Sequence, residues 1–250
     1  MISIISPAKS MDFESVAPSD ASSKAAMGAK SLAILAELRA HSAAEISKLM
    51  KVSEKIAELN YERLQNYDNA PEKQAIFAYA GDVYNNIDSS SWKDGELVFA
   101  QDHLRIISAL YGPLKPLDKI KPYRLEMVTK LADIAPKGLA KLWQHDVTAA
   151  MNAELKMHKN KLLLNIASNE YSAAIDIKSL NVLMVNIHFR EKRDGVLRNI
   201  ALNSKRARGM MADYIVQNKI DDAESTKGFC ESGYQFDYAM SDEGNFFFVK

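Results

Sequence analysis

Residues 162–188 read LLLNIASNEYSAAIDIKSLNVLMVNIH, in which two apolar runs flank a polar segment. The runs Leu162–Ala167 and Val182–His188 are rich in leucine, isoleucine and valine, with few polar interruptions. Short runs of this kind predict strands that are buried on both faces of a sheet. Two more short runs, Ile2–Ile5 and Phe246–Val249, predict further strands.

Helical periodicity lies between the predicted strands. In Leu97–Gly112, apolar residues recur every three positions before a Gly-Pro stop. The same pattern predicts three other helices, over Ser31–Arg39, Asp146–Met157 and Ser204–Asn218. Glu14–Lys30 has few large apolar residues and predicts an exposed loop, and no repeat or Pro/Gly linker divides the chain. We therefore predict a single α+β domain over residues 1–250, with a mixed β-sheet surrounded by helices.

The composition is that of an ordinary globular protein. Hydrophobic residues make up 47% of the 250 residues and charged residues 26%, which excludes global disorder. A chain of this length can bury roughly three quarters of its unfolded surface. Lysine plus arginine equals aspartate plus glutamate, at 32 each, so any attraction to a polyanion must come from uneven placement of charge.

Several sequence features that would indicate a particular class of protein are absent. Cys230 is the lone cysteine and the five histidines show no zinc-type spacing, so we predict a reducing compartment, no metal site and no cofactor. No run approaches the roughly 20 apolar residues of a membrane span, and no basic signal-peptide start is present, which predicts a cytoplasmic protein with no membrane partner. Motifs for a P-loop, a dinucleotide-binding turn, a zinc protease and a serine nucleophile elbow are absent.

The segment at about residues 43–67 predicts two short helices joined by a tight turn. Ser53 is placed to cap the second helix through its hydroxyl. A helix-hairpin-helix can hold a nucleic-acid phosphate at the backbone N–H groups of its turn, although this turn lacks the usual glycines. An ordinary helical hairpin with a solvated lysine face is an equal alternative. Three lysines surround the turn: Lys48, Lys51 and Lys55.

A second basic cluster lies in Pro113–Arg124, which reads PLKPLDKIKPYR. Its cations face only Asp118, and three prolines prevent a regular helix, so we predict a semi-rigid loop that displays the charges. A solvated basic loop without a ligand is the alternative. The cations are Lys115, Lys119, Lys121 and Arg124.

A third basic cluster, Lys205, Arg206 and Arg208, opens the last long predicted helix. Cations in a first helical turn oppose the helix dipole, at a cost of roughly a few tenths of a kcal/mol or more. A bound phosphate would remove that cost, because the helix end, Ser204 and the arginine forks could cradle it. The alternative is that Arg206 or Arg208 pairs with a buried carboxylate.

Polar residues that follow predicted strands suggest a second possible function. Lys9, Asp82 and Glu170 each follow such a strand. If they converge, they could serve as acid and base on a nucleobase or a nucleotide-like substrate. Because every sheet protein places polar residues at strand ends, this enzyme hypothesis depends on whether the three share one cavity.

Six segments carry a family resemblance: SPAKSMDF (Ser6–Phe13), LMKVSEKIAELN (Leu49–Asn60), GDVY (Gly81–Tyr84), LYGPLKPLDKIKPYRLEM (Leu110–Met127), IASNEY (Ile166–Tyr171) and KRARGMM (Lys205–Met211). Together they resemble the bacterial YaaA peroxide-stress-resistance family, over nearly the whole chain. The resemblance implies a cytoplasmic protein that protects bacteria from hydrogen peroxide and is linked to limiting free iron. It also implies DNA binding through a positively charged cleft and a helix-hairpin-helix, the latter at Leu49–Asn60. No catalytic residue or cofactor is implied.

The leading hypothesis is therefore a DNA-binding protein of the peroxide stress response. It would hold the backbone of double-stranded DNA or of a repair intermediate with little sequence specificity. The rival is the enzyme hypothesis, in which the arginines hold the phosphate of a small molecule. A third possibility, iron sequestration by the acidic residues of Asp237–Glu243, is weakened because no histidine lies nearby in the sequence.

Overall fold

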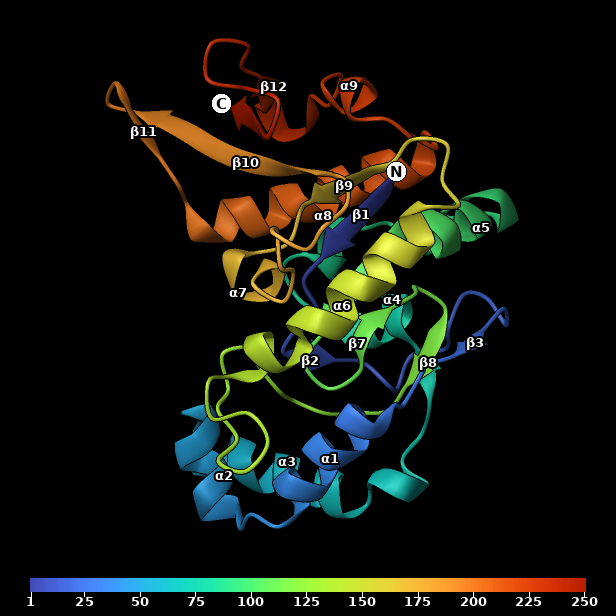
Figure 1. Ribbon diagram of the computed structural model, residues 1–250, viewed down its shortest axis with the longest axis vertical. Coiled ribbons are helices and arrows are strands. Elements are labelled where there is room, and N and C mark those ends of the chain that lie inside the picture. Colours follow the sequence, from blue (N-terminus) through green and yellow to red (C-terminus); the bar gives the residue numbers. More distant parts are fainter.

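The computed structural model describes residues 1–250, and its centre is a mixed sheet of eight strands (Figure 1). Five neighbouring strands run parallel, in the order β13 (Asn245–Val249), β10 (Leu183–Arg193), β9 (Leu162–Asn165), β1 (Ile2–Ile5) and β6 (Leu104–Ser108). Three antiparallel strands complete it, namely β7 (Gly112–Leu114) on β6, β12 (Gln235–Phe236) on β13 and β11 (Val196–Arg198) on β10. The predicted mixed sheet is confirmed.

Helices and two small sheets surround this sheet. The helices are α1 (Ala29–Arg39), α2 (Ala43–Met50), α3 (Glu54–Gln65), α4 (Ala75–Ala78), α5 (Asp94–His103), α6 (Leu139–Leu155), α7 (Asn169–Ser172), α8 (Ala201–Gln217) and α9 (Ala223–Thr226). The small sheets pair β2 (Ser10–Met11) with β5 (Tyr79–Ala80), and β3 (Ser23–Lys24) and β4 (Lys73–Gln74) with β8 (Asp118–Ile120). Helix α6 packs on β7 and β9, whereas α8 packs on β1, β10 and α5. None of the helices is long and apolar enough to cross a membrane.

The central strands lie in one continuous hydrophobic core. In β1 and β9, Ile2, Ile4, Leu163 and Leu164 are fully buried, as the apolar runs predict. Strand β10 differs, because its buried residues alternate with half-exposed ones. One face of β10 is therefore left partly open, and its side chains are available to a site.

The helix predicted over Leu97–Gly112 is wrong in its second half. Helix α5 ends at His103, and the chain continues as β6 between β1 and β7. Leu104, Ile106 and Ile107 are all at most 1% exposed. A strand covered on both faces has no polar alternation, so apolar spacing alone does not separate it from a helix.

The other three predicted helices are present but begin earlier than expected, as α1, α6 and α8. Helix α8 begins at Ala201, so Lys205, Arg206 and Arg208 lie in its second turn and not in its first. The cost of opposing the helix dipole is smaller there, because the effect decays within the first turn. The basic cluster therefore depends on its surroundings more than on the helix end.

Helices α2 and α3 are the two short helices joined by a tight turn that the sequence predicts, and we refer to them as the helical hairpin. Lys51 ends α2 with a φ of 52°, the left-handed conformation that glycine supplies at many helix ends. The Val52 N–H donates to the Ser47 carbonyl at 3.1 Å, which closes the turn without a glycine. Ser53 is the N-cap residue of α3, but its hydroxyl makes no capping hydrogen bond, contrary to the prediction.

The segment Pro113–Arg124 is more regular than the predicted loop. It contains the end of β7 and the whole of β8. Leu114 and Ile120 are buried, and the Asp118 carboxylate accepts a hydrogen bond from the Lys115 N–H at 2.8 Å. The prolines prevent a helix, as expected, and the segment forms short strands, of which β8 contains Lys119.

Candidate functional site

A cavity of about 650 Å³ lies at the carboxyl ends of β1 and β9, beside β10. Within the sheet, β1 has β6 as its neighbour on one side and β9 as its neighbour on the other. After β1, the chain first enters β6 and only later returns to form β9. The cavity thus occupies the point where the strand order reverses, which is where ligands bind in open parallel sheets. Its volume is also within the range of small-molecule sites. We refer to it as the switch-point cavity.

Three loops meet at the floor of the switch-point cavity. The Ser168 N–H donates to Ser6 Oγ at 2.9 Å, which joins the loop after β9 to the loop after β1. Pairing of β2 with β5 brings residues 81–83 to the same place, and the Tyr84 hydroxyl donates to the Ser6 carbonyl at 3.0 Å. Gly81 turns the chain there with a φ of 127°, a backbone conformation that residues with a side chain rarely adopt.

Helix α8 forms the positively charged wall of the cavity. Gly209 lets α8 approach the loop after β5, because a Cβ atom at this position would overlap the carbonyl oxygen of Val83. This contact places Lys205 and Arg208 along the cavity, and the neighbouring strand β10 adds Arg190. The cavity therefore concentrates positive charge from elements that are distant in sequence.

Arg208 is a half-buried cation without a partner. It forms no ion pair, and its Nε is buried without a hydrogen-bond acceptor. Burial lowers the pKa of Arg208, and the neighbouring Arg190 guanidinium lowers it further. The alternative that Arg206 or Arg208 pairs with a buried carboxylate is wrong, because neither forms an ion pair. An anion in the cavity would supply both the missing acceptor and the missing charge.

Lys9, Asp82 and Glu170 all line the switch-point cavity. Glu170 Oε1 accepts the Met127 N–H at 3.0 Å, which fixes one of its two oxygens. Lys9 Nζ forms a 2.7 Å ion pair with Glu126, but its side chain is 54% exposed, so this pair lies at the rim. The fold therefore brings a lysine and two carboxylates from three strand ends into one cavity.

Two more predicted cations lie next to the switch-point cavity. Arg124 reaches Glu126 at 3.5 Å, so this carboxylate stands between Arg124 and Lys9. Arg206 points to an adjoining cavity of about 370 Å³ that shares Asp82 as part of its wall. Together with Lys205 and Arg208, they surround the same end of the sheet.

The remaining predicted lysines lie elsewhere. Lys115 lines a cavity of about 430 Å³ together with His103 and Arg105. Lys119 and Lys121 line a cavity of about 660 Å³ beside Tyr67. The helical hairpin lies near one end of the longest axis, away from α8 (Figure 1). Its predicted contacts are exposed and form no ion pairs: Lys48, Lys51, Ser53 and Lys55.

His188 and Arg190 line the switch-point cavity but were not predicted as site residues. Both belong to the half-exposed face of β10. A signal for them exists, because His188 and Arg190 alternate with Ile187 and Phe189 at the end of an otherwise apolar run. Polar residues at every second position of a strand share one face.

The acidic segment Asp237–Glu243 forms a hydrogen-bonded turn. Asp237 Oδ1 accepts the N–H groups of Ala239 and Met240 at 2.9 and 3.0 Å. Asp242 Oδ1 accepts the Gly244 N–H at 2.8 Å. These carboxylates therefore shape the turn through backbone N–H groups.

Comparison with known proteins identifies close relatives along the full chain. Residues 1–240 match the family described as peroxide stress protein YaaA. UPF0246 proteins from Rickettsia bellii (strain OSU 85-389) and Rickettsia rickettsii (strain Sheila Smith) are each 45% identical over 250 residues, covering 100% of both chains. A UPF0246 protein from Rickettsia felis is 44% identical over the same span. The resemblance carried by the six sequence segments is thus confirmed, and the chain belongs to the YaaA family of peroxide stress proteins.

Proposed function

We propose that this peroxide stress protein binds DNA, and that the switch-point cavity receives a phosphate of the DNA backbone. The observation that carries the proposal is the uncompensated charge of Arg208 beside Arg190. Phosphate oxygens accept hydrogen bonds from guanidinium groups in a charge-assisted geometry, and Lys205 adds charge along the same wall. Contacts to phosphate carry no sequence information, so we propose binding with little sequence specificity.

The helical hairpin is proposed as a second, separate contact to the backbone. Its lysines are exposed and form no ion pairs, so they can approach a polyanion. Because the hairpin and α8 lie in different halves of the molecule (Figure 1), a nucleic acid that touches both must extend along the longest axis. Lys119 and Lys121 are proposed to contribute only if the nucleic acid also passes the cavity beside Tyr67.

We expect the affinity for a fluorescently labelled duplex to fall steeply with salt. The slope of log Kobs against log salt should be roughly −0.9 for each phosphate neutralised, because bound counterions are released. Lys205→Gln should make the slope shallower by about 0.9. Fluorescence anisotropy over a series of salt concentrations measures both effects.

The matched control for this experiment is Lys161→Gln. Lys161 is also exposed, but it precedes β9 and so lies at the opposite ends of the parallel strands from the cavity. Its slope should equal that of the unmodified protein. Salt-independent binding, or an equal change in the two variants, would contradict the proposal.

A second candidate function is catalysis on a nucleobase or a nucleotide-like substrate in the same cavity. The observation that favours it is the convergence of Lys9, Asp82 and Glu170. A lysine and two carboxylates around one ligand can act as general acid and base, while Arg190 and Arg208 hold the phosphate of the substrate. In this candidate the arginines keep the same role, and only the bound molecule differs.

If the protein is an enzyme, we expect it to form product from at least one member of a panel of nucleosides, nucleotides and oligonucleotides. Mass spectrometry measures the product. Glu170→Gln should lower the rate by about 100-fold or more, the usual contribution of a general acid or base. The amide oxygen of the variant can still accept the Met127 N–H, so the fold is preserved. DNA affinity should not fall in this variant, because the substitution removes a negative charge from the cavity proposed to hold a phosphate. If the unmodified protein converts none of these compounds, the enzyme candidate is rejected and the DNA proposal stands alone.

A further inference from the structure

Two histidines and an aspartate from distant parts of the chain meet beside Met1. His103 ends α5, His158 follows α6, and Asp221 follows α8. One potential ligand atom of each residue lies within 4.8 Å of those of the other two. Long segments separate the three residues in the sequence, so spacing alone gives no sign of this group.

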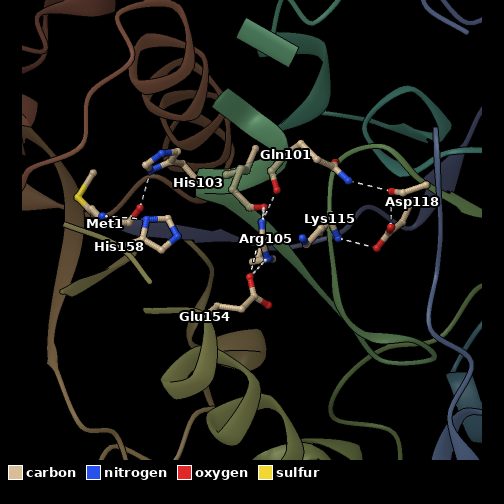
Figure 2. Close-up of polar contacts among 10 residues, drawn as sticks. Met1, Gln101, His103, Arg105, Lys115, Asp118, Glu154 and His158 are labelled. Atoms are coloured by element: carbon tan, nitrogen blue, oxygen red, sulfur yellow. Dashed lines mark hydrogen bonds and ion pairs between the residues drawn. The ribbon is translucent and has the colours of Figure 1, made fainter. Parts of the chain in front are cut away.

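Neighbouring groups hold these side chains in place. His103 Nδ1 lies 2.8 Å from the Met1 carbonyl oxygen and 3.3 Å from Asp221 Oδ1. The His103 and His158 rings meet edge to face, with centroids 4.7 Å apart, and Figure 2 shows both rings beside Met1. Asn160 donates to the second Asp221 oxygen at 3.3 Å. A histidine whose one nitrogen bonds a backbone carbonyl keeps the lone pair of the other nitrogen for a metal ion.

The group already surrounds a positive charge. The Met1 ammonium group forms an ion pair with Asp221 Oδ1 and lies 3.4 Å from His158 Nδ1. Both histidines also line the cavity of about 430 Å³ that contains Lys115, which gives an ion a path of entry. Because cations line this cavity too, net charge does not attract a metal ion. Affinity must come from nitrogen coordination, which favours transition metals over Mg²⁺ or Ca²⁺.

We propose that His103, His158 and Asp221 form a binding site for a divalent transition-metal ion. Two imidazoles and one carboxylate are a donor set typical of zinc and of non-haem iron(II), with the remaining positions taken by water. Donors of one tetrahedral zinc ion lie about 3.4 Å apart, so the side chains must close by up to about 1.4 Å. The ion displaces the Met1 ammonium group from Asp221.

This metal site is separate from the switch-point cavity. His103, His158 and Met1 each precede a strand of the parallel sheet, β6, β9 and β1 respectively, so the site lies at the amino ends of these strands. The cavity lies at their carboxyl ends. The proposal therefore does not rest on DNA binding.

The test is a titration of chelator-treated protein with Co²⁺ and with Zn²⁺. Co²⁺ binding is followed by its visible absorption and Zn²⁺ binding by calorimetry, and we expect one ion per chain. His158→Gln and Asp221→Asn should each weaken binding at least tenfold. His145→Gln is the matched control, because His145 is an exposed histidine on α6 beside Asp146 and outside the group. Its affinity should be unchanged.

A thermal unfolding scan with and without Zn²⁺ separates loss of binding from loss of folding. Zn²⁺ should raise the unfolding temperature of the unmodified protein and of His145→Gln, because a ligand that binds only the folded state stabilises it. It should not raise that of Asp221→Asn. The proposal is overturned if the unmodified protein shows no saturable Co²⁺ binding, or if His158→Gln and Asp221→Asn bind as tightly as His145→Gln.

Discussion

Gly209→Ala is expected to lower the free energy of unfolding by about 2–3 kcal/mol, which corresponds to a fall of roughly 5–10 °C in the unfolding temperature. Gly209 lies in the middle of α8, where alanine would ordinarily be favoured by about 1 kcal/mol. Here the added methyl group would overlap the Val83 carbonyl oxygen and press on the Asn86 side chain. Backbone cannot move aside as a flexible side chain can, so α8 and the loop after β5 must separate.

The control for this prediction is Gly95→Ala in α5. A Cβ atom there would meet only the end of the Lys219 side chain, at 2.9 Å, and that side chain is 51% exposed and free to move. Its stability should stay within about 1 kcal/mol of the unmodified protein. Chemical denaturation of both variants measures the difference. Equal stability of the two variants would show that the contact between α8 and Val83 does not fix the cavity wall.

The fold is predictable from the sequence where burial and periodicity agree. Ile2–Ile5 forms a strand with the predicted bounds, and the apolar runs of β9 and β10 are strands of the central sheet. Strand β6 was missed because a strand covered on both faces resembles one face of a helix over five residues. The early start of α8 was missed because its N-cap residue is Ile200, a side chain that cannot cap a helix, and the structure shows no side-chain cap there.

The site is predictable only in part, because sequence shows residue types but not their distances. Lys9, Asp82 and Glu170 were found from the rule that polar residues follow strands, and they do share one cavity. The same reasoning could not show that Lys115 lies in one cavity and Lys119 in another, because the path of the chain between them depends on the pairing of β8 with β3 and β4. Arg190 and the group formed by His103, His158 and Asp221 depend on long-range contacts, which sequence spacing does not reveal.

Arg208→Met is expected to weaken DNA binding roughly 10- to 100-fold. This is the effect of losing a hydrogen bond to a charged group, which contributes about 1.5–3 kcal/mol. Methionine fills a similar volume without the charge. In the absence of an anion, this variant should be as stable as the unmodified protein or more stable, because it removes a half-buried, unpaired cation beside Arg190. Weaker DNA binding without a loss of stability would show that Arg208 serves binding and not folding.

The role of the switch-point cavity is tested by the DNA affinity of Arg208→Met, measured by fluorescence anisotropy, together with its free energy of unfolding on the same sample. We expect a dissociation constant at least about tenfold higher, with no loss of stability. A dissociation constant equal to that of the unmodified protein would contradict the claim that the switch-point cavity holds a DNA phosphate.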